Sequence, residues 1–156
     1  MQKENQSKKK FFTIICLILK TQGIKMNICG IELKANNVIL VILKNGSYIE
    51  TKIKKIIIED DEKQEDIRKF CNEFLDFLQK NEIEKVFIKK RAKKGAFSGG
   101  AVTFKIEGLI QLNPFCSVDL VSSQTITSYE KKNQIEFPKE LKKYQEQAYL
   151  TALCNI

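Results

Sequence analysis

Residues 27–46, NICGIELKANNVILVILKNG, decide the fold of this chain. The stretch begins with a short apolar segment that carries one carboxylate, Glu32, near its end. Polar turn formers follow, and then the continuous apolar run 38–43, as expected for a strand that is covered on both faces. Asn45 and Gly46 are typical of a type I′ hairpin turn, which needs positive φ at both central residues. The sequence therefore predicts antiparallel strands joined by short turns at the start of a sheet.

Downstream of this hairpin, hydrophobic periodicity predicts strands that alternate with helices. Residues 48–58 form a third, lysine-studded strand that suits a sheet edge. The apolar residues of 67–78 recur at helical spacing, which is the clearest periodic signal in the chain. Two further strands, 86–88 and 118–121, alternate with helices at 101–112, 122–129 and 138–152. The order β-β-β-α-β-α-β-α-α predicts an α/β fold with a mixed five-stranded sheet flanked by helices.

Composition narrows the chemistry that the chain can perform. The 156 residues include no histidine, which removes the commonest general base and the usual Ser-His and Cys-His pairs. The five cysteines are scattered, with no spacing typical of a zinc site or a redox motif. We interpret them as reduced core thiols, which predicts a cytoplasmic protein. Any reaction must therefore rest on carboxylates and lysines.

The segment 1–25 differs from the rest of the chain. It contributes +5 of the net charge of +8, and a short apolar run, FFTIICLIL (11–19), follows three lysines. That run is too short to span a bilayer, which predicts no stable membrane insertion. Three interpretations remain: a dispensable extension or mis-called start upstream of Met26, a targeting or membrane-surface segment, and a packed element. We expect residues 26–156 to form one domain.

The most function-like segment is the basic, glycine-containing loop between the predicted strand 86–88 and the helix that follows it. Glycines that lead into a helix N-terminus attract anions, and flanking lysines add salt-sensitive affinity for phosphate. An aromatic side chain in such a loop can stack on a base. The competing interpretation is a solvated surface loop with a glycine hinge. The candidate phosphate or nucleic-acid ligands are Lys89, Lys90, Arg91, Lys93, Lys94, Gly95, Phe97, Gly99 and Gly100.

The strand order is similar to that of the ribonuclease-H-like fold. The hairpin 27–43 also looks like the opening of RuvC-type Holliday-junction resolvases, where a Gly-Ile-Asp strand presents a metal-binding carboxylate. Over 26–154 the chain resembles a bacterial family, domain of unknown function 3010. That resemblance is carried by CGIELK (29–34), VFIKKRAKKGAFSGGAVTFKIEGLIQL (86–112), the serine pair 122–123 and YQEQAYLTAL (144–153).

The resolvase resemblance implies an acidic cluster that binds two divalent ions, Mg²⁺ or Mn²⁺, and hydrolyses a phosphodiester. The first-strand carboxylate then corresponds to Glu32. The carboxylate expected at the end of the fourth strand corresponds to Lys89, so one expected acid is a base. The acidic pair of the final helix falls near Tyr144 and Gln147, where Glu146 is the only carboxylate. The acidic cluster is thus degenerate.

Two hypotheses follow. The first is a metal-dependent nuclease with Glu32, Glu107 and Glu146 as catalytic residues and with Glu32 and Glu146 as metal ligands. The second is a non-catalytic module on the same fold that binds nucleic acid or protein. Glu32 could instead pair with Lys89, and Glu107 and Glu146 could be solvated helix residues. We expect branched DNA or an RNA–DNA hybrid as the partner. Enzyme status, substrate and oligomeric state stay open.

Overall fold

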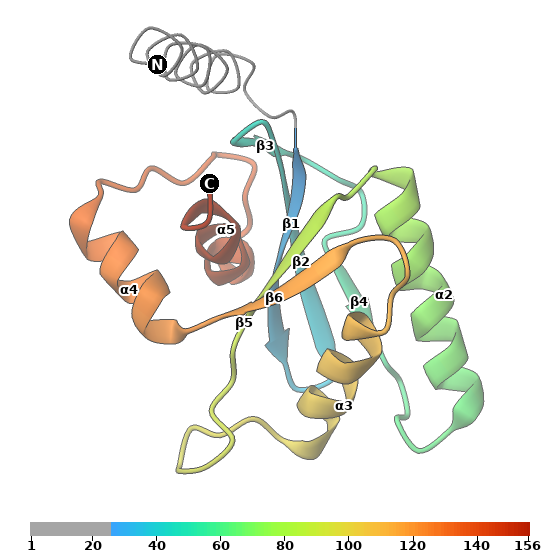
Figure 1. The fold of residues 1–156 in the computed structure, drawn as a ribbon. Coiled ribbons are helices and arrows are strands. Elements are labelled where there is room, and N and C mark those ends of the chain that lie inside the picture. The colour runs from blue at the N-terminus through green and yellow to red at the C-terminus, as the bar shows by residue number, and fades with distance from the viewer. Residues whose placement is uncertain (1–25) are drawn as a thin grey trace, which may run out of the picture.

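The computed structural model describes residues 26–156, so the predictions made for residues 1–25 lie outside the described part. Its sheet starts with β1 (Asn27–Lys34) and β2 (Asn37–Lys44), which pair antiparallel in the predicted hairpin. Strand β5 (Lys85–Lys89) lies parallel to β1, and β6 (Ser117–Val121) lies parallel to β5. The main path of the sheet is β3-β2-β1-β5-β6 (Figure 1).

The predicted third strand is divided in two, so the sheet has six strands instead of five. Strands β3 (Ser47–Ile49) and β4 (Lys55–Ile57) both pair with β2, one at each end. Between them regular pairing is interrupted: the Leu40 amide still donates to the carbonyl of Lys54 at 2.9 Å, but the carbonyl oxygen of Leu40 accepts a hydrogen bond from Nε2 of Gln145 at 2.9 Å. Gln145 is 1% exposed. A buried side chain thus satisfies a backbone group that a continuous strand would pair.

Helices cover both faces of the sheet (Figure 1). Helices α2 (Gln64–Lys80) and α3 (Ala101–Gln111) lie on one face, where three fully buried phenylalanines of α2 meet the alternate residues of β1 and β2. Helices α4 (Ser123–Lys132) and α5 (Glu146–Leu153) lie on the other face. Successive residues of a strand point to opposite faces, so Ile28, Gly30 and Glu32 share the α5 side.

The closing helix is shorter than predicted. A 3₁₀ turn, η1 (Lys143–Gln145), leads into α5 at Glu146, and Pro138 lies in an earlier turn in which its carbonyl oxygen accepts from the Leu141 amide. Phe137 and Leu141 pack on the α5-side core. Tertiary packing therefore holds this segment in place of helix hydrogen bonds. No helix within the described residues is both long enough and apolar enough to cross a membrane.

Candidate functional site

Two charged side chains meet where the parallel strands β1 and β5 end. Ile31 is in register with Ile88, so the next residues, Glu32 and Lys89, are neighbours on adjacent strands. Nζ of Lys89 lies 3.9 Å from Oε1 of Glu32. Both side chains are largely buried, with exposed fractions of 17% for Lys89 and 13% for Glu32. Glu32 thus faces an amine, which is the pairing that the sequence left open as an alternative to a metal site.

A third group reaches this pair because α5 lies very close to β1. A Cβ at Gly30 would overlap the carbonyl oxygen of Ala148 and would come within 2.7 Å of Cβ of Ala152. Only glycine permits this approach, and it places the first turn of α5 over the strand ends. Nζ of Lys89 then donates a hydrogen bond to Oε1 of Gln147 at 2.7 Å. We call Glu32, Lys89 and Gln147 the strand-end triad.

The other two predicted carboxylates lie on helices. Glu107 is buried in α3 at 9% exposure, and its Oε2 has no hydrogen-bond partner within the described part of the chain. It is therefore not the solvated helix residue of the competing interpretation. Glu146 is half-buried in the first turn of α5, where a carboxylate interacts favourably with the helix dipole. Across residues 26–156, no three acidic, cysteine or histidine side chains are grouped so as to hold a metal ion.

The strand-end triad does not fit a divalent metal. Mg²⁺ and Mn²⁺ select oxygen ligands, and Mg²⁺ is usually held by one or two carboxylates together with water and substrate oxygens. Here one carboxylate and one amide oxygen are already directed at an ammonium group. A dication at the same position would meet a positive charge at contact distance in a poorly hydrated site, where repulsion is strong. We therefore derive no catalytic step through a metal ion.

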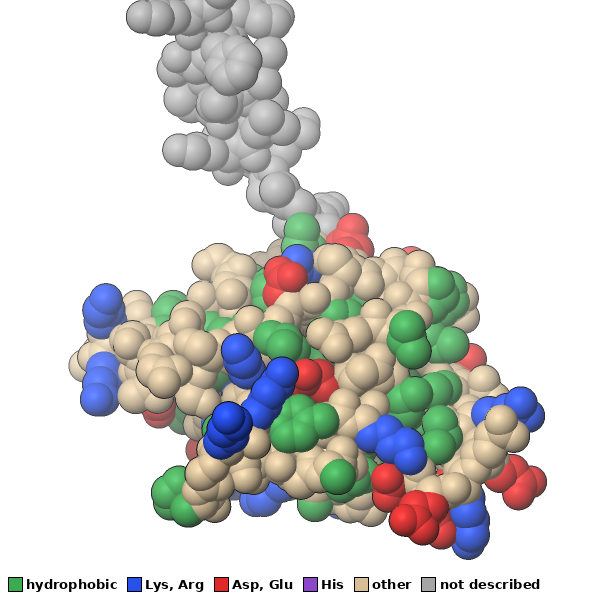
Figure 2. All heavy atoms as spheres, turned by 60° about the horizontal axis from the view of Figure 1, so that its bottom comes forward, with side chains coloured by type: hydrophobic (Ala, Val, Ile, Leu, Met, Phe, Trp, Pro, Cys, Tyr) green, Lys and Arg blue, Asp and Glu red, His purple; other side chains and the backbone are tan. Residues whose placement is uncertain are grey.

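The basic loop begins directly after the triad and turns back on itself. The amide of Gly99 donates to the carbonyl of Ala92 at 2.9 Å, and Gly95 adopts φ +94°, which glycine tolerates without strain. Phe97 is 90% exposed in this loop. In Figure 2 lysine and arginine side chains gather near the middle of the face that comes forward from the bottom of Figure 1. The loop thus presents cations and one bare aromatic ring to solvent.

A surface pocket of about 520 Å³ lies between this loop and the start of α4. Ser122 caps α4, since its side-chain oxygen accepts from the amide of Thr125 at 3.1 Å. A helix N-terminus carries a partial positive charge, which adds to that of the loop cations. The sequence did not predict that α4 forms this wall. The available signal was that parallel strands β5 and β6 end at the same edge of the sheet. The pocket is lined by Lys90, Arg91, Ala92, Lys93, Ser122, Ser123 and Gln124, and we call it the cationic pocket.

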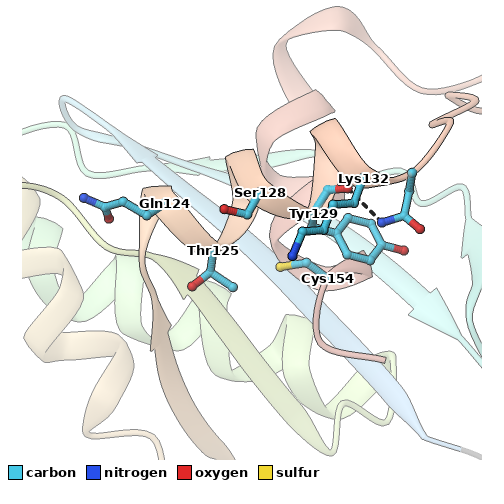
Figure 3. A pocket seen from close by; sticks show the side chains of 7 residues that line it. Gln124, Thr125, Ser128, Tyr129, Lys132 and Cys154 are labelled. Atoms are coloured by element: carbon cyan, nitrogen blue, oxygen red, sulfur yellow. Dashed lines mark hydrogen bonds between the residues drawn. The ribbon is translucent and has the colours of Figure 1, made fainter.

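A second pocket, of about 460 Å³, lies along α4, from Gln124 in its first turn to Asn133 just after its last residue, with Cys154 at the end of α5 also lining it (Figure 3). It contains no predicted site residue. Its one thiol, Cys154, has a pKa raised by burial, so it stays protonated and a weak nucleophile at neutral pH. Cys29, Cys71, Cys116 and Cys154 are all free. This pocket offers polar contacts but no charged cluster comparable to the cationic pocket.

The fold defines a class of protein. The chain is similar to solved structures of RuvC, and the expected ribonuclease-H-like α/β fold is thereby confirmed. For "T. thermophilus RuvC in complex with Holliday junction substrate" the identity is 12%, the TM-score is 0.59, and the match covers 83% of this chain and 91% of that one. For "Thermus thermophilus RuvC structure" the values are 11%, 0.61, 83% and 92%.

Within that class, the chain belongs to the family described as Protein of unknown function (DUF3010), whose model matches residues 26–155. The family resemblance predicted from the sequence is therefore confirmed. No curated protein matches the chain.

Proposed function

We propose that this protein binds nucleic acid without cleaving it, through the cationic pocket and the exposed loop beside it. The observation that carries the proposal is the pocket itself, where three loop cations face the N-terminus of α4 across a space of about 520 Å³. Phosphate oxygens are the natural ligands of such a surface, because both the side chains and the helix end are positive. The net charge of residues 26–156 is only +3, so binding depends on this local concentration of charge.

The strand-end triad supports a non-catalytic role. Hydrolysis of a phosphodiester by this class of fold relies on acids that hold metal ions, and at this position Glu32 is engaged by Lys89. Lys89 is also withdrawn from the loop surface by its hydrogen bond to Gln147. We therefore assign phosphate contact to Lys90, Arg91 and Lys93 and give Lys89 a structural role.

Branched DNA is the first ligand to test. One similar structure is that of RuvC with a Holliday junction substrate, and the present chain shares its fold across most of its length. Phe97 adds a second feature that suits unpaired or junction bases, because an exposed ring can stack on a base that has left a duplex. Single-stranded DNA, duplex DNA and an RNA–DNA hybrid of the same sequence serve as comparison ligands.

The test is fluorescence anisotropy with the labelled junction over a range of salt concentrations. Replacing Lys90, Arg91 and Lys93 together by Gln should weaken binding by roughly 30–100-fold at low salt and should reduce the slope of log K against log salt by about three. The matched control replaces Lys131, Lys132 and Lys139 by Gln, which removes the same charge away from the pocket and should change affinity by less than about threefold. Equal losses in both variants would contradict the assigned surface.

A second candidate function is metal-dependent hydrolysis, which the RuvC-like fold and the buried, unpaired oxygen of Glu107 favour. Each ligand is therefore also incubated with Mg²⁺ or Mn²⁺ and analysed for cleavage. We expect none. Cleavage that requires the metal ion and is lost in Glu32→Gln would replace the binding proposal with an enzyme in which Glu32, Glu107 and Glu146 act together.

A further inference from the structure

The oxygen atoms of the strand-end triad are arranged around a single positive charge. Oε1 of Gln147 lies 2.7 Å from Nζ of Lys89, and Oε1 of Glu32 lies 3.9 Å from the same atom. The two oxygens come from different elements, β1 and α5, and the ammonium comes from a third, β5. A cation therefore sits where the ends of two strands and the start of a helix converge.

The backbone enforces this convergence. Parallel pairing puts Glu32 beside Lys89, and the contact of α5 with Gly30 fixes the height of Gln147 above them. Ala148, the residue after Gln147, is fully buried against β1. Packing fixes the positions of β1, β5 and α5, so the three side chains start close together. Substituting Lys89 should therefore leave the backbone positions of Glu32 and Gln147 unchanged.

We infer that the ammonium of Lys89 is the permanent cation of this position and replaces a divalent metal ion. The chain itself supplies the positive charge that the Glu32 carboxylate requires and the donor that the Gln147 amide oxygen accepts from, so the site needs no ion from solution and repels one. The inference does not depend on nucleic-acid binding, because it concerns the charge balance of the folded protein alone.

The experiment measures Mn²⁺ binding in the absence of nucleic acid. Free Mn²⁺ is followed by electron paramagnetic resonance, and thermal unfolding is recorded with Mn²⁺ and with EDTA. Wild-type protein should show no saturable binding up to millimolar Mn²⁺ and no shift in Tm. The double variant Lys89→Asp, Gln147→Glu supplies three carboxylates at the same position, including Glu32. It should bind about one Mn²⁺ per chain and should unfold at a higher temperature with Mn²⁺ than with EDTA.

The control is Lys85→Asp, which repeats the charge change of Lys89→Asp at the opposite end of β5, where Lys85 pairs with Asp119, without the further carboxylate that Gln147→Glu adds. It should bind no Mn²⁺. Two results would overturn the inference: saturable Mn²⁺ binding by the wild type that is lost in Glu32→Gln, or a folded double variant that binds no more Mn²⁺ than the Lys85 control. If the double variant does not fold, the Mn²⁺ titrations of the wild type and of the Glu32→Gln variant still test the inference. Because no nucleic acid is present, failure here would remove the support for the absence of cleavage but would leave the proposed binding surface standing, and failure of nucleic-acid binding would leave this inference standing.

Discussion

Strand β5 carries a lysine at each end, and the two lysines have very different surroundings. Lys85 forms an ion pair with Asp119 of β6 at 2.6 Å, with side-chain exposures of 24% and 59%. Its Nζ also lies 5.4 Å from the ring centre of Phe87. Lys89 lies farther from its carboxylate, at 3.9 Å, but both members of that pair are largely buried. Gln147 supplies a third contact only at the Lys89 end.

We expect removal of one partner to cost more at the longer, largely buried ion pair than at the shorter one. Water and salt reach the Lys85 pair through Asp119, whose side chain is 59% exposed, so we expect the pair to contribute about 0–1 kcal/mol to stability. The Glu32 carboxylate has little water to replace its partner, so its dependence on the Lys89 ammonium is greater. What separates the two ends is the cover that α5 provides, and that cover depends on the absence of a side chain at Gly30.

The largest expected effect comes from removing that cover. Gly30→Ala introduces a methyl group that overlaps the backbone of α5, and backbone cannot move aside as a flexible side chain can. We expect a loss of roughly 3 kcal/mol or more in the free energy of unfolding, measured by urea denaturation. The control is Gly108→Ala in α3, where the added methyl group meets nothing within 4 Å. That variant should gain about 0.5–1 kcal/mol from helix propensity. Equal stability of the two variants would mean that α5 does not rest on β1 as described.

The second largest effect compares the loss of stability when each of the two lysines is substituted. Lys89→Met keeps most of the unbranched side chain but leaves Glu32 without its cation and Gln147 without its donor, so we expect a loss of about 2–3 kcal/mol in the free energy of unfolding. Lys85→Met should cost at most about 1 kcal/mol, because Asp119 remains solvated. Adding Glu32→Gln to Lys89→Met should restore about half of the loss. If the double variant is no more stable than the single one, the charge of Glu32 is not the cause.

The sequence predicted the features that depend on one short segment and missed those that depend on contacts between distant segments. The β1–β2 hairpin and the core face of α2 each rest on a pattern within one short, continuous segment, and the sequence predicted both. The pairing of Glu32 with Lys89 was left as an alternative, because the strand order implied adjacent strands but did not fix which groups face each other. The break between β3 and β4 was not predicted, since the Leu40 carbonyl that it leaves without a strand partner is satisfied by Gln145, 105 positions away.

The candidate site likewise contains some residues that the sequence predicted and others that it did not. The loop cations are visible as a run of charge, and they were named in advance. The wall formed by Ser122–Gln124 was not, because it depends on two parallel strands that end side by side. The contact of Lys89 with Gln147 spans 58 positions and depends on the approach of α5 at Gly30. The resolvase resemblance implied that Lys89 is unusual at its position, and only the packing shows what it binds.

The smallest expected effect is the difference between the two ion pairs in how their coupling energies respond to salt. Double-mutant cycles give the coupling energy of each pair, with Lys→Met combined with Asp119→Asn at one end and with Glu32→Gln at the other. Raising the NaCl concentration about tenfold, to roughly 0.5 M, shortens the Debye length to about 4 Å, which screens charges that solvent can reach. The Lys85–Asp119 coupling should start at about 0.5 kcal/mol and fall towards zero. The Lys89–Glu32 coupling should start at about 1–2 kcal/mol and keep more than half of its value, because ions cannot enter between two largely buried groups. Parallel decreases at the two ends would show that α5 does not shield the strand-end triad, and would remove the reason for treating Lys89 as a built-in cation.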